Sequence, residues 1–485
     1  MRISVVEKVL SWVETRGDIV AVADPQNSLT YKELKSAIIR TAKYFKDRTL
    51  KESECVLIQA TNCVDFVVGL FAIHYAGGIA VPIDGKLPEE NIKSILSDTN
   101  ARFIIADSIT AYGADTIPLT GISRMEENGK DIELSFPKLD QYADVLFTTG
   151  TTGIPKGVLF NHLNLVGVVE NLIGGSHMED GTVYLVYGPL NHAFAIRKIY
   201  YTLFCGCTVV LMNGLIDLKL FYSMLDKYKV TATHLLPAAA RIVLKLTSKQ
   251  LAQYSDQLVM VESGTAPYPE EDMDKLRETL PNTRLYFGYG CSESDCITKL
   301  EFSKHPDKIG SVGMLTVNSE VKLVDAQKNE IHATKDNPGF IACKSIVNMV
   351  GYWKEPELTA EVLQDGFFYT NDLGYIDEDG YLYVLGRVGD VINVGGIKVS
   401  AKEIEDLATK FPAIEDCAVI PVADPISTQT PKLFIQISNG TAYDEMELRD
   451  YLRSSLETYK VPKYIEVIDK IPRNFIGKIQ KSKLS

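Results

Sequence analysis

LFTTGTTGIPKG, from Leu146 to Gly157, is the stretch that decides how this chain is interpreted. It follows an apolar run and holds three glycines, four threonines and Lys156. Glycines allow backbone turns that a Cβ forbids, and threonine hydroxyls with exposed backbone N–H groups can surround an anion. The spacing from Gly150 to Lys156 differs from the Walker pattern GxxxxGK[ST]. The stretch therefore predicts a polyphosphate-binding loop of another type, rather than a flexible surface loop.

Outward from this loop, short β-branched runs alternate with segments of helical period. Helices are predicted at 64–75, where the apolar spacing gives one apolar face, and at 218–228. Strands are predicted at the apolar runs 55–58, 79–83, 102–106, 208–212 and 231–236. Strand, crossover helix and strand in succession are typical of parallel sheets covered on both faces. The predicted fold class is therefore α/β.

After about residue 340 the sequence changes to short strands and tight turns. Asp379 and Gly380 predict a hairpin, and a new small unit follows Gly386. It contains predicted strands at 417–422 and 433–437, an amphipathic helix at 443–457 and a basic tail. We expect an N-terminal domain over 1–386, a hinge at 387–390 and a C-terminal α+β domain over 391–485.

Composition excludes several classes of protein. The chain has 485 residues, 46% of them hydrophobic and 23% charged, which excludes disorder and a disulfide-stapled miniprotein. Fifty basic against 63 acidic residues give a net charge of −13, which argues against nucleic acid as a partner. Eight sparse cysteines without zinc-ligand spacing predict a reducing compartment and no structural metal.

Targeting signals are not apparent either. Glu7, Lys8 and Glu14 interrupt what would have to be the apolar core of an export signal. The most membrane-like stretch, 66–83, contains His74, two glycines and a proline, so it reads as helix, turn and strand. We expect a cytoplasmic protein without membrane insertion.

The loop at 148–156 resembles, at every position, the phosphate-loop signature of the acyl-adenylate-forming (AMP-binding) superfamily, which holds acyl-CoA synthetases, adenylation domains of peptide synthetases and firefly luciferases. Further segments resemble the motifs of this family along the whole chain: LTYKEL (29–34), AGGIAVPID (76–84), PLNH (189–192), GYGCSES (288–294), GYWKEPELT (351–359), YTNDLGYIDEDGYLYVLGRVGD (369–390) and PRNFIGKIQKSKL (472–484). The resemblance implies a large N-terminal α/β domain of doubly wound sheets with a small barrel-like subdomain, and a small mobile α+β C-terminal domain.

The resemblance also implies a reaction. A carboxylate attacks the α-phosphate of ATP, pyrophosphate leaves, and the protein mainly neutralises phosphate charge. Glu293 is similar to the Mg²⁺ ligand of the family, Ser292 keeps the hydroxyl of its commoner threonine, and Thr151 is expected to act in catalysis. The phosphates would be held by Thr148, Thr149, Gly150, Thr151, Thr152, Gly153 and Lys156.

On the nucleoside side, Tyr289 and Gly290 would lie against adenine, and the segment Gly264, Thr265 and Ala266 would line the same site. Asp372 matches the acid that accepts hydrogen bonds from the ribose, and Arg387 matches its basic partner near the α-phosphate. Lys478 resembles the adenylation lysine that reaches the α-phosphate and the substrate carboxylate. Without the family motifs, Asp372 would read as a turn former and Lys478 as one cation of a solvated tail.

Three residues bear on the acid. His192 resembles the histidine that acyl-CoA synthetases carry near the carboxyl group, and the segment lacks the aspartate that would hold an α-ammonium group, which disfavours an amino acid. Gly290 leaves open a pocket that acetate-restricted relatives cap with an aromatic ring, so the acid is expected to be larger than acetate, with an apolar or aromatic body. Arg197 could pair with a second carboxylate, but a solvated helix flank is the favoured interpretation.

In the second half-reaction of the family, the small domain rotates and a thiol attacks the adenylate. Gly395 and Gly396 resemble the loop that lines the pantetheine channel. Gly389 stands at the usual pivot, and Asn371 replaces a glycine that we expect to need positive φ. The preferred function is an AMP-forming acid–thiol ligase that uses ATP, Mg²⁺ and coenzyme A. The alternatives are a stand-alone enzyme that loads a separate carrier protein, and a non-catalytic nucleotide-binding relative, against which the retained charged motif residues argue.

Overall fold

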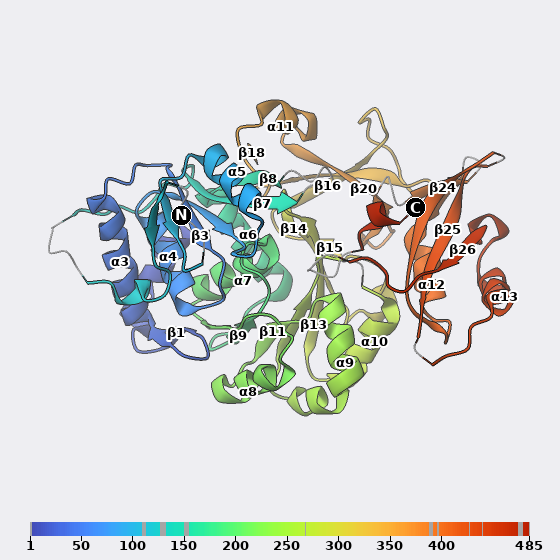
Figure 1. Ribbon diagram of the computed structural model, residues 1–485, viewed down its shortest axis with the longest axis horizontal. Coiled ribbons are helices and arrows are strands. Elements are labelled where there is room, and N and C mark those ends of the chain that lie inside the picture. Colours follow the sequence, from blue (N-terminus) through green and yellow to red (C-terminus); the bar gives the residue numbers. More distant parts are fainter. Residues whose placement is uncertain are drawn as a thin grey trace.

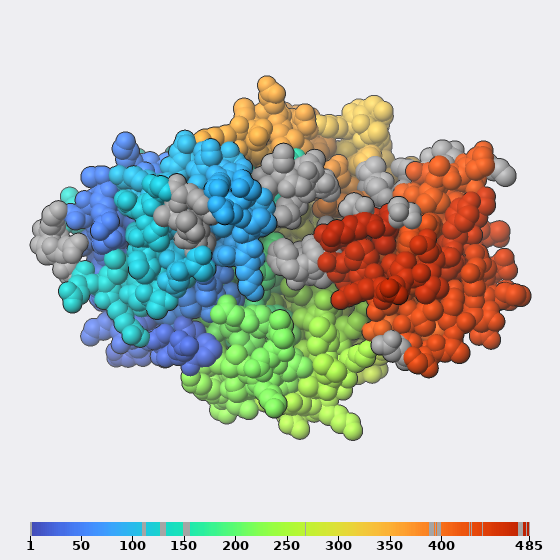
Figure 2. Space-filling model, in the orientation of Figure 1, coloured from blue at the N-terminus to red at the C-terminus, as the bar shows by residue number. Residues whose placement is uncertain are grey.

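The computed structural model of the protein describes residues 2–108, 113–126, 132–149, 155–266, 268–387, 391–394, 397–425, 427–438, 440–473 and 479–484. Within these ranges the strands form four sheets. The first two sheets and their helices make up the body of the chain, and the third lies toward the C-terminal lobe (Figure 1). Figure 2 shows the fourth sheet and its helices as a lobe in orange-red and red at one end of the molecule.

The first sheet carries the predicted phosphate loop. Its strand order is β18 (Gly351–Tyr352), β8 (Pro155–Asn161), β7 (Tyr142–Thr149), β4 (Ile79–Ile83), β3 (Cys55–Gln59), β5 (Phe103–Ile105) and β6 (Asp115–Ile117). The strands from β7 to β6 pair in parallel, whereas β7 and β8 form an antiparallel hairpin. The predicted loop, 148–156, begins at the end of β7 and finishes at the start of β8, and its residues 150–154 lie outside the described part of the chain.

The second sheet has the order β15 (Met314–Leu315), β14 (Asp295–Glu301), β13 (Arg284–Cys291), β12 (Met260–Ser263), β11 (Ala232–His234), β9 (Val183–Val186), β10 (Thr208–Leu211), β1 (Val20–Ala23) and β2 (Ser28–Thr30). Its central strands are parallel, so their carboxyl ends meet at one edge. Ligands of such sheets bind at that edge. The segments 188–194 and 264–266 follow strands β9 and β12, and the segment 288–294 spans the end of β13 and the turn after it.

The third sheet pairs β16 (Ser319–Val324), β17 (Gly339–Ser345), β20 (Phe367–Ile376) and β19 (Leu363–Gln364), with β21 (Leu382–Arg387) beside β20. The predicted hairpin is present, and Gly380 has φ +87° in its turn. The fourth sheet holds β23 (Ile397–Ser400), β22 (Val391–Val394), β25 (Thr428–Ile437) and β24 (Ile414–Asp424), with β26 (Tyr464–Val467) beside β25. It begins just after the predicted hinge.

The helices cover these sheets. They are α1 (Val5–Ser11), α2 (Val13–Arg16), α3 (Tyr31–Asp47), α4 (Val64–Tyr75), α5 (Glu89–Thr99), α6 (His162–Ser176), α7 (Ala193–Phe204), α8 (Leu218–Tyr228), α9 (Pro237–Leu251), α10 (Glu270–Thr279), α11 (Pro356–Val362), α12 (Ala401–Ala408) and α13 (Glu445–Ser455). Thr30 and Glu33 form a capping box that starts α3. In the described part of the chain, no helix combines the length and apolar character needed to cross a bilayer.

Two local predictions are wrong in an informative way. Helix α4 was expected to bury one face, but it is buried along nearly its whole length, because α1, α3 and the first sheet surround it. Asn371 was expected at positive φ, but it lies inside β20 in ordinary extended backbone, so no glycine-like conformation is needed there. The remaining predicted helices and strands are present within a few residues of their expected ends.

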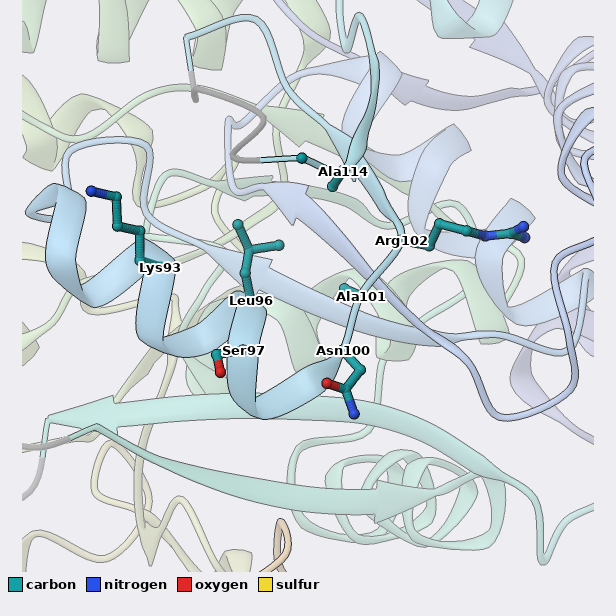
Figure 3. Close-up of a pocket in the computed structure, with 8 residues that line it drawn as sticks. Lys93, Leu96, Ser97, Asn100, Ala101, Arg102 and Ala114 are labelled. Carbon is teal, nitrogen blue, oxygen red and sulfur yellow. The ribbon is translucent and has the colours of Figure 1, made fainter.

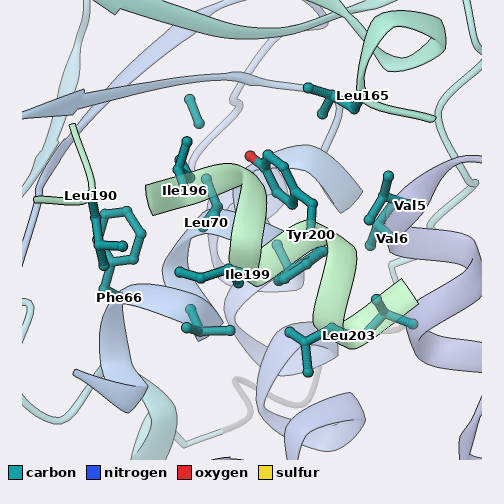
Figure 4. Close-up of a cluster of buried hydrophobic side chains, with 14 of the residues drawn as sticks. Val5, Val6, Phe66, Leu70, Leu165, Leu190, Ile196, Ile199, Tyr200 and Leu203 are labelled. Atoms are coloured by element: carbon teal, nitrogen blue, oxygen red, sulfur yellow. The ribbon is translucent and has the colours of Figure 1, made fainter. Parts of the chain in front are cut away.

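Helix α7, near the predicted acid site, is buried from Ala195 to Leu203. Figure 4 shows Ile196, Ile199, Tyr200 and Leu203 of α7 among apolar side chains from α1, α4 and α6. Burying an aliphatic side chain of this size contributes about 1.5–3 kcal/mol. The helix is therefore a rigid platform, and its first turn follows directly after His192.

Candidate active site

The predicted nucleoside residues lie together. The Tyr289 hydroxyl donates a hydrogen bond to Oδ2 of Asp372 at 2.7 Å, and Arg387 Nε lies 3.2 Å from Oδ1. Asp372 and Arg387 are opposite each other across β20 and β21, whereas Tyr289 comes from β13 of another sheet. Burial and the neighbouring carboxylate raise the pKa of Tyr289 well above its ordinary value. The tyrosine thus stays neutral and ties the two sheets at this carboxylate.

The predicted phosphate and metal residues meet at a tyrosine that sequence reasoning did not single out. Tyr352 on β18 donates its hydroxyl to Oε1 of Glu293 at 2.9 Å, and the Lys156 ammonium lies 5.7 Å from the centre of its ring. Backbone pairing fixes this arrangement, because β18 pairs with β8 and the Met349 amide donates to the Glu293 carbonyl at 2.7 Å. Tyr352 is the second residue of the motif GYWKEPELT and follows Gly351, which pairs with β8. That motif was therefore the feature of the sequence that pointed to this tyrosine.

Several predicted residues lie outside the described part of the chain. These are Gly150, Thr151, Thr152 and Gly153 of the phosphate loop, Gly389 of the hinge, Gly395 and Gly396 of the predicted thiol channel, and Lys478. The hairpin on which the phosphate loop sits is described, and Thr148 is paired with Lys156 across it. The Thr148 hydroxyl donates to the Lys156 carbonyl at 3.4 Å. Thr149 ends β7.

Two glycines of the predicted motifs are required by the packing around them. Gly157 was expected to allow a turn, but it lies inside β8, where a Cβ would come within 2.8 Å of Val145 and 3.0 Å of Trp353. Gly290 was expected to keep the acid pocket open. A Cβ there would fall 1.4 Å from the Asp295 carbonyl oxygen at the register shift between β13 and β14. The hairpin itself therefore requires Gly290, and its bearing on substrate size stays a prediction.

The segment after β12 has a strained backbone. Thr265 is exposed and has φ +70°, a conformation that β-branched residues rarely adopt. Gly264 before it is buried, and a Cβ there would come within 2.9 Å of the Gly288 carbonyl oxygen and 3.3 Å of the Phe194 ring; Ala266 after it is half-buried. Strain of this kind persists where surrounding structure imposes it, often at ligand sites. The three predicted residues thus lie at the sheet edge beside α7 and β13.

His192 lies half-buried at the N-cap position of α7. Burial lowers the pKa of His192, and the opposing effect of Asp84 is smaller. A histidine in this state is neutral at pH 7 and can accept or donate a hydrogen bond without adding charge. This suits the predicted role beside a carboxyl group. Ser292 is half-buried in the turn that also carries Glu293.

Arg197 contradicts both interpretations considered for it. It is 1% exposed, so it is not a solvated flank, and its charge is already taken up by carboxylates of the chain. Its Nη1 lies 2.8 Å from Oδ2 of Asp144, and its Nε lies 3.0 Å from Oδ2 of Asp295. Asp144 also contacts His74 Nε2 at 2.9 Å. No periodicity in the sequence links these residues, because each comes from a different element.

A second buried ion cluster lies on the same helix. Lys198 is 2% exposed and contacts Oε2 of Glu262 at 2.7 Å, while Lys299 contacts Oε1. Tyr184 and Ser176 donate hydrogen bonds to the same carboxylate. Beside this cluster, His234 is fully buried, stacks on Tyr187, and finds no hydrogen-bond partner for either ring nitrogen among the described residues. Burial, with a smaller effect of Lys198, lowers its pKa to about 3.

The buried histidine predicts acid sensitivity. Between pH 6.5 and pH 3 the unfolded chain binds a proton at His234 that the folded chain does not, so stability falls as the pH drops through this range. From pH 7 to pH 5 this amounts to about 2 kcal/mol for one histidine. We expect His234→Gln to reduce the acid-side loss of unfolding free energy by about this amount in urea titrations. An unchanged pH slope would contradict a neutral His234.

A pocket of about 670 Å³ lies elsewhere, at the end of α5. Figure 3 shows Lys93, Leu96 and Ser97 of α5 on one side of it and Ala114 on the other. None of the predicted site residues that the structure describes lines this pocket. It is therefore separate from the candidate active site.

The donor set around Glu293 fits Mg²⁺ bound together with a nucleotide. Among the described residues, no group of three or more His, Cys, Asp and Glu side chains is placed to hold a metal ion. A single carboxylate cannot complete an octahedral oxygen shell, whereas a carboxylate with triphosphate oxygens and water can. Glu293 and Lys156 both lie beside Tyr352, so Glu293 would hold Mg²⁺ close to the lysine that is expected to bind the phosphates.

Comparison with known proteins identifies the family. Residues 10–353 match the AMP-binding enzyme family, and residues 403–478 match the AMP-binding enzyme C-terminal domain. The chain therefore belongs to the AMP-binding enzyme family, which confirms the resemblance inferred from its motifs.

The chain is similar over nearly its whole length to curated acid–CoA ligases. Feruloyl-CoA synthase of Amycolatopsis sp is 29% identical, covering 96% of this chain and 95% of that protein. Long-chain-fatty-acid–CoA ligase of Bacillus subtilis is 27% identical, covering 96% and 91%. 4-Coumarate–CoA ligase 1 of Narcissus pseudonarcissus is 27% identical, covering 94% and 88%.

Solved structures confirm the predicted fold. ATP-bound MatB of Rhodopseudomonas palustris matches with a TM-score of 0.90 at 23% identity, covering 100% of this chain and 98% of that one. The o-succinylbenzoate CoA synthetase MenE of Bacillus subtilis, in complex with its acyl-adenylate, matches with a TM-score of 0.87 at 23% identity, covering 99% and 97%. The fold is that of an adenylate-forming enzyme, with two large sheets, a smaller subdomain and a small C-terminal unit.

Proposed function

We propose that this protein is an AMP-forming acid–CoA ligase whose acid is larger than acetate and has an apolar or aromatic body. The proposal rests on the way in which the predicted phosphate-binding and ribose-binding residues are connected. Tyr352 brings the phosphate-loop lysine and Glu293 together, while Tyr289, on the strand that leads to Glu293, holds Asp372. A triphosphate at one end and a ribose at the other are the two parts of ATP.

We propose the following roles for the residues of the chain. Lys156 neutralises charge on the β and γ phosphates, the loop hydroxyls donate hydrogen bonds to them, and Asp372 accepts hydrogen bonds from ribose hydroxyls. Glu293 would hold Mg²⁺, which supplies positive charge to the phosphate oxygens when bound. Neutral His192 orients the acid carboxylate without trapping it as an ion pair. Lys478 stabilises the charge that develops as the carboxylate attacks the α-phosphate.

The relatives support the size of the acid. Their names specify coumarate, ferulate and long-chain fatty acids, all of which carry an extended apolar or aromatic body. Near the predicted acid site, Phe194 and Tyr187 pack against the buried His234 ring, and Leu236 is half-buried. Such a lining favours a neutral body over a second carboxylate.

The thiol is proposed to be coenzyme A, because the curated relatives are CoA ligases. We further propose that the C-terminal unit, 391–485, rotates about 387–390 between the two half-reactions. Ser400 donates its hydroxyl to the Leu385 carbonyl at 2.7 Å, a contact that such a rotation would have to break. A separate carrier protein remains the alternative acceptor.

A pyrophosphate-release screen tests the proposed function. Straight-chain, branched and aromatic acids are supplied with ATP and Mg²⁺, with and without coenzyme A. We expect release with at least one acid larger than acetate, and formation of its thioester only when coenzyme A is present. Turnover with a carrier protein but not with coenzyme A would favour the alternative, and no release with any acid would contradict the proposal.

Glu293→Ala tests the proposed metal ligand. We expect the Mg²⁺ concentration for half-maximal pyrophosphate release to rise about tenfold or more, because the phosphates must then hold the ion without the carboxylate. Glu320→Ala, an exposed residue on β16, is the matched control and should leave the titration unchanged. An unaltered metal titration in Glu293→Ala would remove this residue from the site.

A further inference from the structure

Arg197 lies where three segments of the candidate site meet. It is on the second turn of α7, shortly after His192. One side of its guanidinium contacts Asp144 on β7, the strand that leads to the phosphate loop, and the other contacts Asp295. Its plane also lies 4.5 Å from the ring centre of Phe160 on β8. A single buried side chain thus contacts both strands of the phosphate-loop hairpin and the β13–β14 turn.

The turn from 291 to 295 carries the proposed metal ligand. Asp295 has φ +48°, and its side chain is held at both oxygens: Oδ1 accepts from the Cys296 amide at 2.8 Å and Oδ2 from Arg197. Glu293, two residues earlier, is anchored on its other side by Tyr352 and by the Met349 amide. The backbone between these two anchors is short, so a shift at Asp295 displaces Glu293.

The arginine is itself fixed. Asp144 is fully buried and accepts the Tyr200 hydroxyl at 3.0 Å besides contacting His74 and Arg197. The His162 ring packs edge-on against His74 at 5.1 Å. A planar guanidinium can bridge two carboxylates from fixed directions, which a lysine ammonium on a flexible stem cannot reproduce. These contacts define the position of Asp295 relative to α7 and β7.

We propose that Arg197 is a positioning residue for the adenylation half-reaction, which holds Asp295 and thereby sets the place of the Glu293 carboxylate relative to Mg²⁺ and ATP. The inference rests on the proposed function for the role of Glu293. In this role Arg197 makes no contact with the substrate.

Asp295→Asn in the full-length protein tests it, because this change weakens the link to Arg197 and leaves the Arg197–Asp144 pair in place. We expect the Mg²⁺ concentration for half-maximal pyrophosphate release to rise about tenfold, as removal of a partner of a metal ligand typically does. Binding of Mn²⁺ in the presence of ATP, followed by electron paramagnetic resonance, should weaken by a similar factor. Conversion of supplied acyl-adenylate to thioester should be unchanged.

Lys198→Met is the matched control, since Lys198 is the next residue of α7, equally buried and charged, but bound to Glu262. We expect its metal titration to equal that of the wild type, whereas Arg197→Lys should follow Asp295→Asn. Unchanged Mn²⁺ binding in Asp295→Asn, or an equal shift in Lys198→Met, would overturn the proposal. Failure of the proposed function is a separate outcome: the wild type would then release no pyrophosphate, while the Mn²⁺ measurement would still compare the variants.

Discussion

Replacing Lys478 by alanine is expected to lower the rate of adenylate formation by about 10²- to 10³-fold while leaving the second half-reaction nearly intact. The reason is that one preorganised cation at the reacting centre stabilises the charge of the transition state by several kcal/mol. Thioester formation from a supplied acyl-adenylate does not involve attack on phosphate. Single-turnover measurements of the two half-reactions, made separately, check this prediction.

Lys483→Ala is the control for this experiment, because Lys483 is an exposed cation of the same basic tail. It should leave both half-reactions within a factor of about two of the wild type. If Lys478→Ala slows both half-reactions equally, the lysine acts on folding or domain placement, and its assignment to the α-phosphate is wrong.

The second large effect concerns stability. Glu262→Ala is expected to destabilise the protein by about 3–5 kcal/mol, because it leaves the ammonium groups of Lys198 and Lys299 buried without a counter-charge. Burial opposes ionisation of Glu262, but the two lysines hold its pKa far below the ordinary value. The carboxylate is therefore charged in the folded protein. Urea unfolding at pH 7 measures the loss.

Lys198→Met gives the matched comparison. Burial lowers the pKa of Lys198, and Lys299 remains to balance Glu262, so we expect this variant to lose only about 1 kcal/mol. The prediction is most specific about the order of the two losses, since Glu262→Ala should lose more stability than Lys198→Met. A larger loss in Lys198→Met than in Glu262→Ala would show that the cluster is not governed by its uncompensated charge.

Much of the fold was predictable because local patterns agree with the global structure. The predicted bounds of three elements match the observed ones closely: the apolar runs at β3 and β4, and the helical segment at α8. The one-face prediction for α4 failed because periodicity reports which residues are apolar, not how many neighbours surround the helix. The prediction of positive φ for Asn371 failed for a related reason, because its position in a motif does not reveal that β20 continues through it.

In the candidate site, too, some residues could be predicted from the sequence and others could not. Glu293, Asp372 and Lys156 stand in contiguous motifs, so the sequence singled them out, and the structure connects Glu293 to Lys156 through Tyr352 and Asp372 to Tyr289. Tyr352 and Arg197 contact partners on other elements, and no spacing along the chain predicts those contacts. Gly290 shows a third case: the residue was noticed, but the sequence did not reveal that a Cβ there would clash with a backbone oxygen five residues away.

The most direct test of the account is a crystal structure of the full-length protein with Mg²⁺ and a non-hydrolysable ATP analogue. We predict the ribose hydroxyls at Asp372, the β and γ phosphates at the loop from Thr148 to Lys156, and the metal ion bound by Glu293. A nucleotide bound elsewhere, or one whose phosphates point away from Lys156 and Glu293, would contradict it.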